Sequence, residues 1–337
     1  MKALRIDSFG LDRIALAEVD RPVPAEGQAL LRVRAASLNF RDVLVARGDY
    51  NRQYPLPLTL GSDAACVVES FGPATDPGRF RVGDRVCPAL AQSWFDGPPL
   101  RDAVRYTLGG PLPGVFAEYV TSRVDALVPI PSSLSDVEAA CLPCAGVTAY
   151  SALAVWSRLE AGQSLLSLGS GGVSSFAIQL AKQLGARVIA TTTKSDKTAR
   201  LEALGAEVVT IDGPGWGRQV RAQVGGEGVD HVMEVGGAGT LAESLQAVRP
   251  GGTVSLVGVL AAGEPAGPSL TPVIMRNIRL QGVFVGHHRA FESLVAHIDQ
   301  HPFHPVVDRV FPLEQARDAI QHLISGQHVG KVCLTVS

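Results

Sequence analysis

The spacing of apolar residues changes along the chain and divides it into two regions. Up to about residue 130, short segments alternate apolar and polar positions, as half-buried strands do, and turn residues separate them. From about Pro131 onward, short continuous apolar segments alternate with segments of helical periodicity. Apolar strands separated by helices of this length are typical of a parallel, doubly wound sheet. The pattern therefore predicts a β-rich region followed by an α/β region.

The elements that this pattern predicts follow the same division. The first region is expected to hold one helix at 40–48 and strands at 29–39, 65–72, 84–90 and 114–122. In the second region a capping-box pair, Ser135 and Glu138, opens a helix that is expected to continue to residue 156. Six strands separated by helices are then expected at 164–169, 186–192, 207–211, 229–236, 251–260 and 277–286.

The end of the chain returns to mixed elements without a phosphate-binding signal. A helix at 291–300, a strand near 306–311, a helix at 313–324 and a strand at 331–336 are expected there. We predict that this tail folds back onto the first region. The expected domains are therefore 1–127 with 286–337, which is β-rich and catalytic, and 128–285, which binds the nucleotide. The irregular segment 92–113 is a candidate lid or interface arm.

Composition and charge exclude several classes of function. The chain has 337 residues, of which 46% are hydrophobic and 18% charged, and its net charge is −2. Nucleic acid and anionic membranes are therefore not expected as partners, and no segment has the ~20 apolar residues of a membrane span. The charged, strand-like start does not resemble a signal peptide. An odd number of cysteines, five, then favours reduced thiols in a cytoplasmic protein.

A glycine-rich turn, "SLGSGGVSSF" at 167–176, follows the first of the six predicted strands. Gly169, Gly171 and Ser174 occupy the three marked positions of the dinucleotide fingerprint, with Ser in place of the last Gly. The helix beginning near Gly172 directs free N–H groups at an anion. The alternative is a tight turn without a ligand, but the strand before it and the helix after it favour nucleotide binding. The predicted cofactor contacts of this turn are Gly169, Ser170, Gly171, Gly172, Val173 and Ser174.

The end of the second α/β strand bears on which nicotinamide cofactor is used. An enzyme that uses NAD carries Asp or Glu there, whereas this chain has Thr192 and Thr193, with Lys194 and Lys197 just beyond. Neutral hydroxyls and lysines suit the 2′-phosphate of NADPH. The alternative is that both lysines belong to a solvated helix start, because exposed lysines are common. We predict NADPH.

Several motifs, taken in order, resemble one family over essentially the whole chain. The chain resembles the medium-chain dehydrogenases/reductases, and within them the zinc-independent, quinone-oxidoreductase-like branch, through "AASLNFRDVLVARGDY", "LGSDAACVVESFGP", "FRVGDRV", "GVFAEYV", "LPCAGVTAYSAL", "LGSGGVSSFAIQLAKQLGARVIATT", "VDHVMEVGG", "RPGGTVSLVGVL" and "GKVCLTV". The resemblance implies an α/β fold in which a Rossmann-type, doubly wound parallel sheet is joined to a β-rich GroES-like catalytic domain. It also suggests a homodimer joined through the last strand of the nucleotide-binding sheet.

The resemblance also locates where zinc-dependent members hold their metal. At those positions this chain has Asn39, Ser62 with Asp63, and Cys144. One thiol with an amide and a hydroxyl is not a catalytic zinc site, because such a site keeps three protein ligands. No zinc is therefore expected. Cys141 and Cys144 form a C-x-x-C, which suggests either redox chemistry or, as we favour, two buried small residues.

Without a metal, the expected acceptor is a quinone or an α,β-unsaturated carbonyl. Hydride delivery to such an acceptor gives a delocalised anion that hydrogen-bond donors can stabilise. By resemblance, the catalytic candidates are Asn39, Asp42 and Tyr50, with Tyr50 as a donor to the carbonyl oxygen. Asp42 has the alternative role of a helix cap or a partner of Arg41, and Tyr50 that of packing. The same resemblance assigns further cofactor contacts to Thr148, Gly258, Phe284, Val285 and Lys331.

Two other functions remain open at the level of sequence. One is an alcohol or aldehyde dehydrogenase of the same superfamily with an altered metal site. The other is a non-catalytic NADPH-binding sensor protein, because one fold carries many functions. Metal analysis would distinguish an alcohol or aldehyde dehydrogenase from a zinc-independent NADPH-dependent reductase. Turnover of a broad acceptor panel would distinguish that reductase from a non-catalytic sensor.

Overall fold

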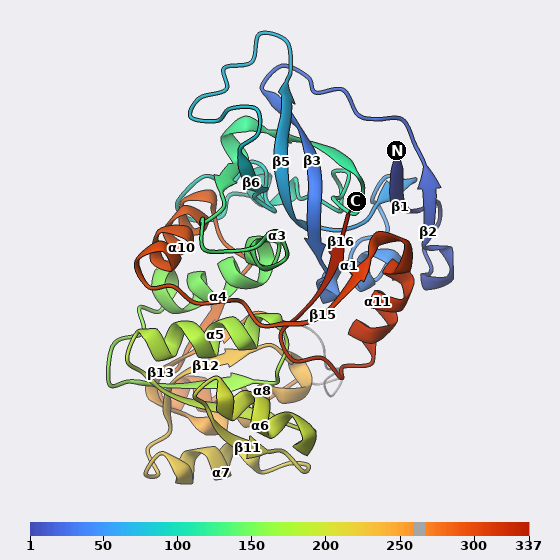
Figure 1. Cartoon of the computed structure of the whole chain (residues 1–337). Helices are drawn as coiled ribbons and strands as arrows, with labels where there is room; N and C mark the ends of the chain where they lie inside the picture. Colours follow the sequence, from blue (N-terminus) through green and yellow to red (C-terminus); the bar gives the residue numbers. More distant parts are fainter. Residues whose placement is uncertain (259–266, 337) are drawn as a thin grey trace. The chain divides into compact units, whose positions relative to one another are not determined.

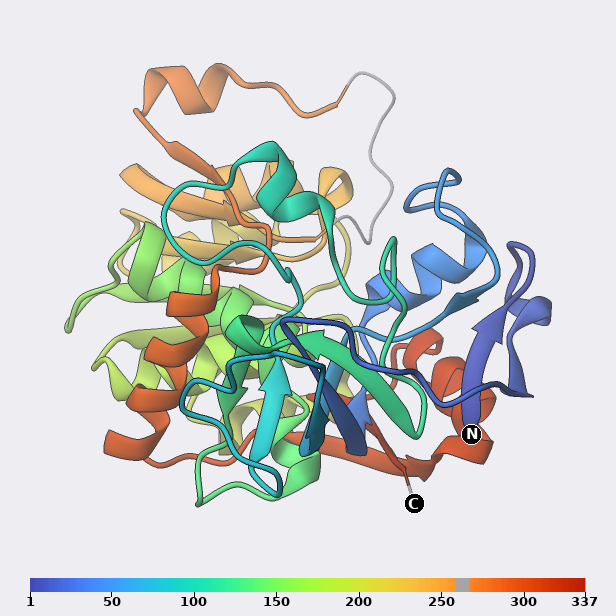
Figure 2. The same ribbon diagram turned by 90° about the horizontal axis from the view of Figure 1, so that it is seen from above.

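The computed structural model describes residues 1–258 and 267–336, and the chain forms two compact units (Figure 1). Unit 1 comprises Met1–Val147 and His287–Ser337, and unit 2 comprises Thr148–Gly286. The first and last segments of the chain, blue and red in Figure 2, both belong to unit 1. Unit 1 extends past residue 127 because the helix α3 (Asp136–Ala139) packs against three strands of its main sheet.

Unit 1 is built on a seven-stranded sheet that joins the two ends of the chain. Its strand order is β15-β16-β3-β5-β6-β8, with β7 also paired to β3, and every pair except β15 with β16 is antiparallel. A second sheet has the order β2-β1-β4. The strands are β1 (Lys2–Ile6), β2 (Ala15–Glu18), β3 (Gln28–Ser37), β4 (Leu58–Thr59), β5 (Asp63–Phe71), β6 (Arg85–Pro88), β7 (Tyr119–Arg123), β8 (Leu127–Pro129), β15 (Val307–Pro312) and β16 (Lys331–Thr335).

The core of unit 1 lies against β3 and β5, the long strands of this sheet. Leu31 and Val33 of β3 are buried with Phe116 and with Ile320 of α11, so apolar positions far apart in the sequence close one core. The helices of unit 1 are α1 (Phe40–Arg47), α2 (Arg101–Arg105), α3, α10 (His288–Gln300) and α11 (Ala316–Ile324), with short 3-10 turns η1 (Leu11–Arg13), η2 (Val124–Ala126) and η6 (Leu313–Gln315).

Unit 2 contains one parallel sheet of six strands, as the alternating pattern predicts. Its strand order is β11-β10-β9-β12-β13-β14, and all pairs are parallel. The chain adds strands toward one edge from β9 to β11 and toward the opposite edge from β12 to β14, which is the dinucleotide-binding arrangement. The strands are β9 (Ser164–Leu168), β10 (Arg187–Thr192), β11 (Glu207–Thr210), β12 (Val229–Glu234), β13 (Val248–Leu256) and β14 (Arg279–Gly282). The last two positions of the strand expected at 251–260 lie outside the described residues.

Helices connect these strands in chain order. They are α5 (Gly172–Gln183), the 3-10 turn η5 (Ser195–Lys197), α6 (Thr198–Ala203), α7 (Trp216–Gln223), α8 (Ala238–Ala247) and α9 (Thr271–Met275). Contacts of α5 with β9 and β10, and of α8 with β12 and β13, bury the apolar faces of the strands. In the described parts of the chain, no helix has the length and apolar character needed to cross a bilayer.

One helix expected from the sequence is interrupted. The segment from Ser135 to Trp156 was expected to be continuous, but it forms α3, a π-helical segment η3 (Leu142–Gly146), α4 (Val147–Tyr150) and a second π-helical segment η4 (Ser151–Trp156). Pro143 lacks the N–H that a regular helix needs at that position, so the hydrogen-bond pattern changes there. The capping box of Ser135 and Glu138 is present as predicted.

Candidate active site

The glycine-rich turn joins β9 to α5 in the geometry that the fingerprint requires. Gly169 has φ +70, and a Cβ atom there would meet nothing within 4 Å, so this turn is open on that side. The Gly169 N–H donates to the Thr191 carbonyl oxygen at 3.0 Å, and α5 begins at Gly172 with Gly171 as its N-cap. Gly171 itself has φ −74, so positive φ requires glycine at 169 and not at 171. Free N–H groups of α5 are thereby available for an anion.

Two serines of this turn make contacts that the sequence pattern did not indicate. The Ser174 hydroxyl donates to the Leu168 carbonyl oxygen at 2.6 Å and so ties the start of α5 to the end of β9. The Lys197 ammonium donates to Ser170 Oγ at 2.9 Å, and Lys197 is only 7% exposed. The Lys197 side chain is therefore directed at the turn and is not part of a solvated helix start.

The other residues predicted at the end of β10 have differing environments. Thr192 is buried, and its hydroxyl exchanges hydrogen bonds with the backbone of Lys194. Thr193 is exposed and Lys194 is half-buried. The tight turn at Thr192 thus fixes the backbone that leads to Lys197.

The later predicted cofactor residues of unit 2 lie on two strand ends and one helix. A Cβ atom at Gly258 would lie 1.8 Å from the Val235 carbonyl oxygen, so two backbones approach closely there. Phe284 and Val285 follow β14, and Val285 has φ +46, an unusual conformation for a β-branched residue. Thr148 is buried in α4.

In unit 1, a buried polar cluster forms around the Lys331 ammonium. Lys331 Nζ donates to Asn39 Oδ1 at 2.5 Å and to the Leu38 carbonyl oxygen at 2.8 Å, and it lies 3.6 Å from Asp63 Oδ2. Asn39 Nδ2 in turn donates to Ser62 Oγ at 3.2 Å. The structure therefore joins Lys331, which the resemblance assigned to the cofactor, to Asn39 and Asp63, which it placed at metal-ligand positions.

Burial and charge act in opposite directions on this cluster. Burial raises the pKa of Asp63, and the Lys331 ammonium opposes that rise. For Lys331, burial alone would lower the pKa, but Asp63 and the nearby cysteines raise it above its ordinary value. Lys331 and Asp63 therefore form a buried ion pair inside unit 1.

Asp42 occupies the third position of α1 and closes its N-terminus. Its carboxylate accepts from the Asn39 N–H at 2.8 Å, and the pair forms a capping box. Burial raises the pKa of Asp42 to about 6, with Arg41, 4.0 Å away, acting in the opposite sense. This geometry matches the helix-cap alternative for Asp42, and the cap also fixes the backbone of Asn39.

Tyr50 lies just beyond the end of α1 and is 38% exposed. Its ring centroid lies 5.4 Å from the Arg41 guanidinium carbon and 6.2 Å from the Tyr54 ring. The phenol is thus accessible while its ring is flanked by a cation and a second aromatic ring.

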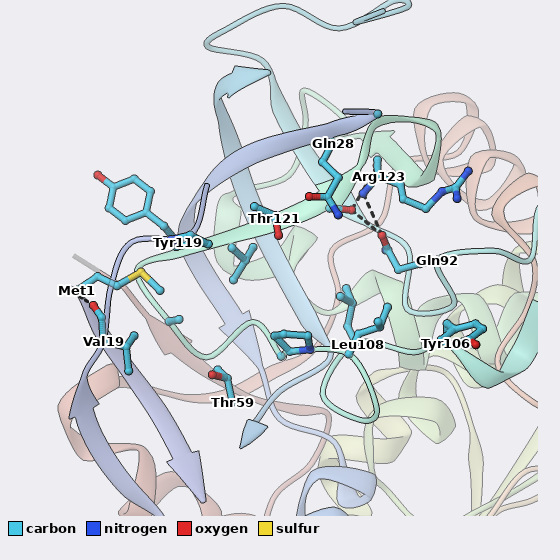
Figure 3. A pocket seen from close by; sticks show the side chains of 18 of the residues that line it. Met1, Val19, Gln28, Thr59, Gln92, Tyr106, Leu108, Tyr119, Thr121 and Arg123 are labelled. Atoms are coloured by element: carbon cyan, nitrogen blue, oxygen red, sulfur yellow. Dashed lines mark hydrogen bonds between the residues drawn. The ribbon is translucent and has the colours of Figure 1, made fainter. Parts of the chain in front are cut away.

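A separate pocket of about 600 Å³ lies in unit 1 (Figure 3). Gln28, Thr59, Tyr119 and Thr121 line it from the strands, and the buried Gln92 carboxamide accepts from the Arg123 N–H at one end. Among the described residues, none of the predicted catalytic or cofactor-binding ones lines this pocket. It therefore adds nothing to the assignment of the site.

Comparisons with known proteins agree with this architecture. Two family descriptions match, the alcohol dehydrogenase GroES-like domain over residues 25–132 and the zinc-binding dehydrogenase over residues 172–300. A zinc-type alcohol dehydrogenase-like protein of Schizosaccharomyces pombe is 37% identical, and the match covers 97% of this chain and 96% of that protein. This chain belongs to the medium-chain dehydrogenase/reductase superfamily.

Other members of the superfamily are similar over their full lengths. An acryloyl-coenzyme A reductase of Metallosphaera sedula is 28% identical, with 94% of this chain and 95% of that protein covered. Among solved structures, an NAD-dependent alcohol dehydrogenase is 31% identical with a TM-score of 0.91, and each chain is covered completely. The quinone oxidoreductase of Coxiella burnetii is 28% identical, with a TM-score of 0.81 and coverage of 100% and 99%. A mycobacterial protein solved with NADPH is 26% identical, with a TM-score of 0.85 and coverage of 99% and 100%.

Because the superfamily includes zinc-binding dehydrogenases, the donor atoms around Asn39 could in principle bind zinc. Asn39 Oδ1 already accepts from the Lys331 ammonium, and a cation that close disfavours a second, divalent one. Cys144 is one thiol among an amide and a hydroxyl, whereas a catalytic zinc site keeps three protein ligands. Within the described residues, no group of three or more His, Cys, Asp or Glu side chains is arranged to hold a metal ion. These side chains do not fit a catalytic zinc.

Proposed function

We propose that this medium-chain dehydrogenase/reductase is an NADPH-dependent reductase of quinones or α,β-unsaturated carbonyls that works without zinc. The observation that carries the proposal is the Asn39–Lys331 contact. Asn39, at a position where zinc-dependent members have a metal ligand, is held instead by the Lys331 ammonium, and Tyr50 in the same unit is 38% exposed. Hydrogen-bond donors of this kind suffice for the delocalised anion that such acceptors form.

The cofactor part of the proposal rests on the turn at 169–174. NADPH, when bound, supplies the hydride. The N–H groups at the start of α5 would face its pyrophosphate, and Lys197, held by Ser170, would face the 2′-phosphate. Thr192, Thr193 and Lys194 complete that side, where a carboxylate would repel the phosphate. A relative solved with NADPH supports this choice, and a relative described as NAD-dependent makes NADH the required comparison.

The roles of the residues in unit 1 follow from their partners. Tyr50 would donate a proton to the acceptor oxygen. Asn39, oriented by Lys331 and by the Asp42 cap, would donate its amide hydrogen to the acceptor or to the nicotinamide carboxamide. Thr148, Gly258, Phe284 and Val285 would line the nicotinamide side. One relative is named an acryloyl-coenzyme A reductase, and acryloyl thioesters belong to the proposed class of conjugated acceptor.

Two further features of the proposal concern the protein as a whole. We expect a homodimer formed through β14, the last strand of the parallel sheet, beside which Leu270, Ile274 and Met275 are exposed. All five cysteines are free thiols, which fits a cytoplasmic protein.

The test is turnover with a defined panel of acceptors. Purified protein is mixed with NADPH or NADH and with 1,4-quinones, enones and simple aldehydes, before and after treatment with a chelator. We expect reduction of quinones or enones with NADPH, no stoichiometric zinc and no effect of the chelator. Gly171→Val serves as the inactive control, because a side chain there would displace the pyrophosphate while the fold stays intact.

Names of relatives make an alcohol or aldehyde dehydrogenase the second candidate. That function predicts about one zinc per chain, loss of activity on chelation and preference for simple aldehydes in the same panel. A protein that binds NADPH yet reduces nothing in the panel would instead be a non-catalytic sensor.

A further inference from the structure

Arg41 connects α1 to the end of the irregular segment 92–113. Its Nη1 donates to the Leu108 carbonyl oxygen at 2.9 Å, and its Nη2 donates to Thr107 Oγ1 at 3.3 Å. The side chain is 10% exposed. Hydrogen bonds from a buried guanidinium are among the stronger ones in proteins, and two from one planar group fix orientation as well as distance. Arg41 therefore holds residues 107 and 108 in one place.

The turn formed by residues 107–110 closely approaches neighbouring groups on two sides. A Cβ atom at Gly109 would lie 2.5 Å from the Gly61 carbonyl oxygen, and one at Gly110 would lie 2.5 Å from Tyr54 Cε2. The Thr107 hydroxyl also donates to the Gly110 carbonyl oxygen. Gly109 is thus packed against the backbone of Gly61, and Gly110 is packed against the Tyr54 ring.

The same guanidinium also flanks the candidate proton donor. Arg41 lies over the Tyr50 ring, and the Tyr50 ring is adjacent to that of Tyr54. A cation over an aromatic face is attracted to it, which limits how the ring can turn. Arg41, the two tyrosines and the 107–110 turn therefore form one connected structure, which we call the Arg41 wall.

The charge of Arg41 is already balanced within unit 1. Asp42 Oδ1 lies 4.0 Å from Nη1. Both Nη groups also donate hydrogen bonds, Nη1 to the Leu108 carbonyl oxygen and Nη2 to Thr107 Oγ1. Among the described residues, only the Nε of this guanidinium is buried without a hydrogen-bond partner. An acidic acceptor is therefore not required to neutralise Arg41, and the residue is better suited to shaping a surface than to binding an anion.

We propose that Arg41 is a positioning residue that sets acceptor specificity, by holding the 107–110 turn and Tyr50 as a rigid wall for flat, conjugated acceptors. The inference rests on the proposed function, since it takes Tyr50 as facing the acceptor. A two-ring acceptor contacts more of such a wall than a one-ring acceptor does. Loosening the wall therefore costs the larger acceptor more binding in the transition state.

The experiment compares Arg41→Met and Arg41→Lys with Arg47→Met, an exposed arginine on the same helix. With saturating NADPH, kcat and KM are measured for 1,4-benzoquinone and for 2-methyl-1,4-naphthoquinone. We expect Arg41→Met to lower kcat/KM for the naphthoquinone about tenfold more than for the benzoquinone. Arg41→Lys keeps the positive charge but lacks the planar guanidinium. Its kcat/KM for the naphthoquinone should lie between those of Arg41→Met and the parent. Arg47→Met should match the parent, and the affinity for NADPH should be unchanged in all three.

A second readout does not depend on turnover. Amide hydrogen exchange at residues 107–112 should quicken in Arg41→Met and in Thr107→Val, and it should return to the parent rate in Thr107→Ser, which keeps the hydroxyl. If Arg41→Met does not fold, Thr107→Val takes its place in the acceptor comparison. Equal losses for both quinones, or none, would overturn the proposal for Arg41 alone. A parent protein that reduces neither quinone nor enone would overturn the proposed function itself.

Discussion

Two of the predicted site lysines, Lys331 in unit 1 and Lys197 in unit 2, have buried side chains. Lys331 is 3% exposed and is satisfied within unit 1 by Asn39, the Leu38 carbonyl oxygen and Asp63. Lys197 is 7% exposed and reaches back to the glycine-rich turn through Ser170. A buried lysine needs a partner, and those of Lys331 are in the protein. Under the proposed function, Lys197 would also contact the 2′-phosphate of NADPH.

Replacing Lys197 should therefore separate the two nicotinamide cofactors. We expect Lys197→Ala to weaken NADPH binding about tenfold to hundredfold, since one charge-assisted contact to phosphate contributes roughly 1.5–3 kcal/mol. NADH, which lacks the 2′-phosphate, should lose little. Calorimetric titration with each cofactor measures the difference. Lys182→Ala, at an exposed position of α5, is the control. An equal loss for both cofactors would mean that Lys197 supports the turn and does not contact the phosphate.

His231, in β12, links stability to pH. Burial lowers its pKa from 6.5 to about 4, and its Nε2 lies 2.9 Å from Ser255 Oγ. The unfolded chain binds a proton near pH 6.5, whereas the folded chain resists protonation until about pH 4. The contribution of His231 is therefore complete above pH 6.5 and is lost as the pH falls toward 4, by up to about 3 kcal/mol.

The measurement is the free energy of unfolding in urea at several pH values from 7 down to 4.5. The parent protein should lose stability steadily through this range, and His231→Gln should lose less of it, because glutamine does not titrate. Other histidines contribute to both curves, so the difference between them isolates His231. Parallel curves would contradict the assignment.

Among residues, the sequence was informative where a motif has a fixed geometry. It located Gly169 and the start of α5, because strand, turn and helix follow each other directly. It did not indicate that Lys331 meets Asn39 and Asp63, which the resemblance had placed at metal-ligand positions. Those residues are up to 292 positions apart, and pairing across such a separation depends on sheet register. Nor did it indicate that Arg41 would contact Thr107 and Leu108.

At the scale of elements, the ends of β12 and β13 approach each other closely. Gly258 N–H lies 3.3 Å from the Glu234 carbonyl oxygen, and a Cβ atom at Gly258 would collide with the Val235 carbonyl oxygen. Glu234 is fully buried and accepts from the Gly236 and Gly237 N–H groups. There is therefore no room for a side chain at position 258, just after the end of β13.

Gly258→Ala should destabilise unit 2 by about 2–3 kcal/mol, as overpacking does when backbone must move. Gly282→Ala is the matched control, because a Cβ atom at that exposed strand position meets nothing within 4 Å. Thermal or urea denaturation of the two variants gives the comparison. If both variants unfold like the parent, the two strand ends are not in contact.

Most elements could be predicted from periodicity alone. The six parallel strands were found because each is a short apolar segment between helices, and β3 was found because its inward positions alternate. The expectation of one continuous helix at 135–156 was wrong, because Pro143 and the π-helical turns after it change the hydrogen-bond pattern. Periodicity does not detect such a change, because apolar residues continue through it.

At the scale of the whole molecule, β14 is the edge of the parallel sheet, and α9 beside it is unusually apolar at its surface. Ile274 and Met275 are each 74% exposed and Leu270 is 56% exposed. An edge strand with unpaired backbone groups next to such a patch favours pairing with a second copy.

We expect the parent to form the proposed homodimer and the double variant Ile274→Glu with Met275→Glu to be monomeric, since the homodimer would have to bury the introduced charges. Sedimentation velocity gives the masses directly. Val23→Glu, at a position of unit 1 that is 86% exposed, should leave the parent mass unchanged. A dimer that persists in the double variant would place the subunit contact elsewhere.

The order of the chain in unit 1 also has a consequence for synthesis on the ribosome. The segment Thr148–Gly286 contains every strand of its own sheet, so it has its complete set of pairing partners before the rest of the chain emerges. Unit 1 does not, because β3 pairs with β16, which is made only after the whole of unit 2. Until then Asp63 and Asn39 lack the Lys331 ammonium, and a buried carboxylate without its cation is costly. The nascent β-rich unit therefore stays incompletely closed until β16 is made, and we expect a chain terminated after Gly286 to be cut by proteases more readily than the parent.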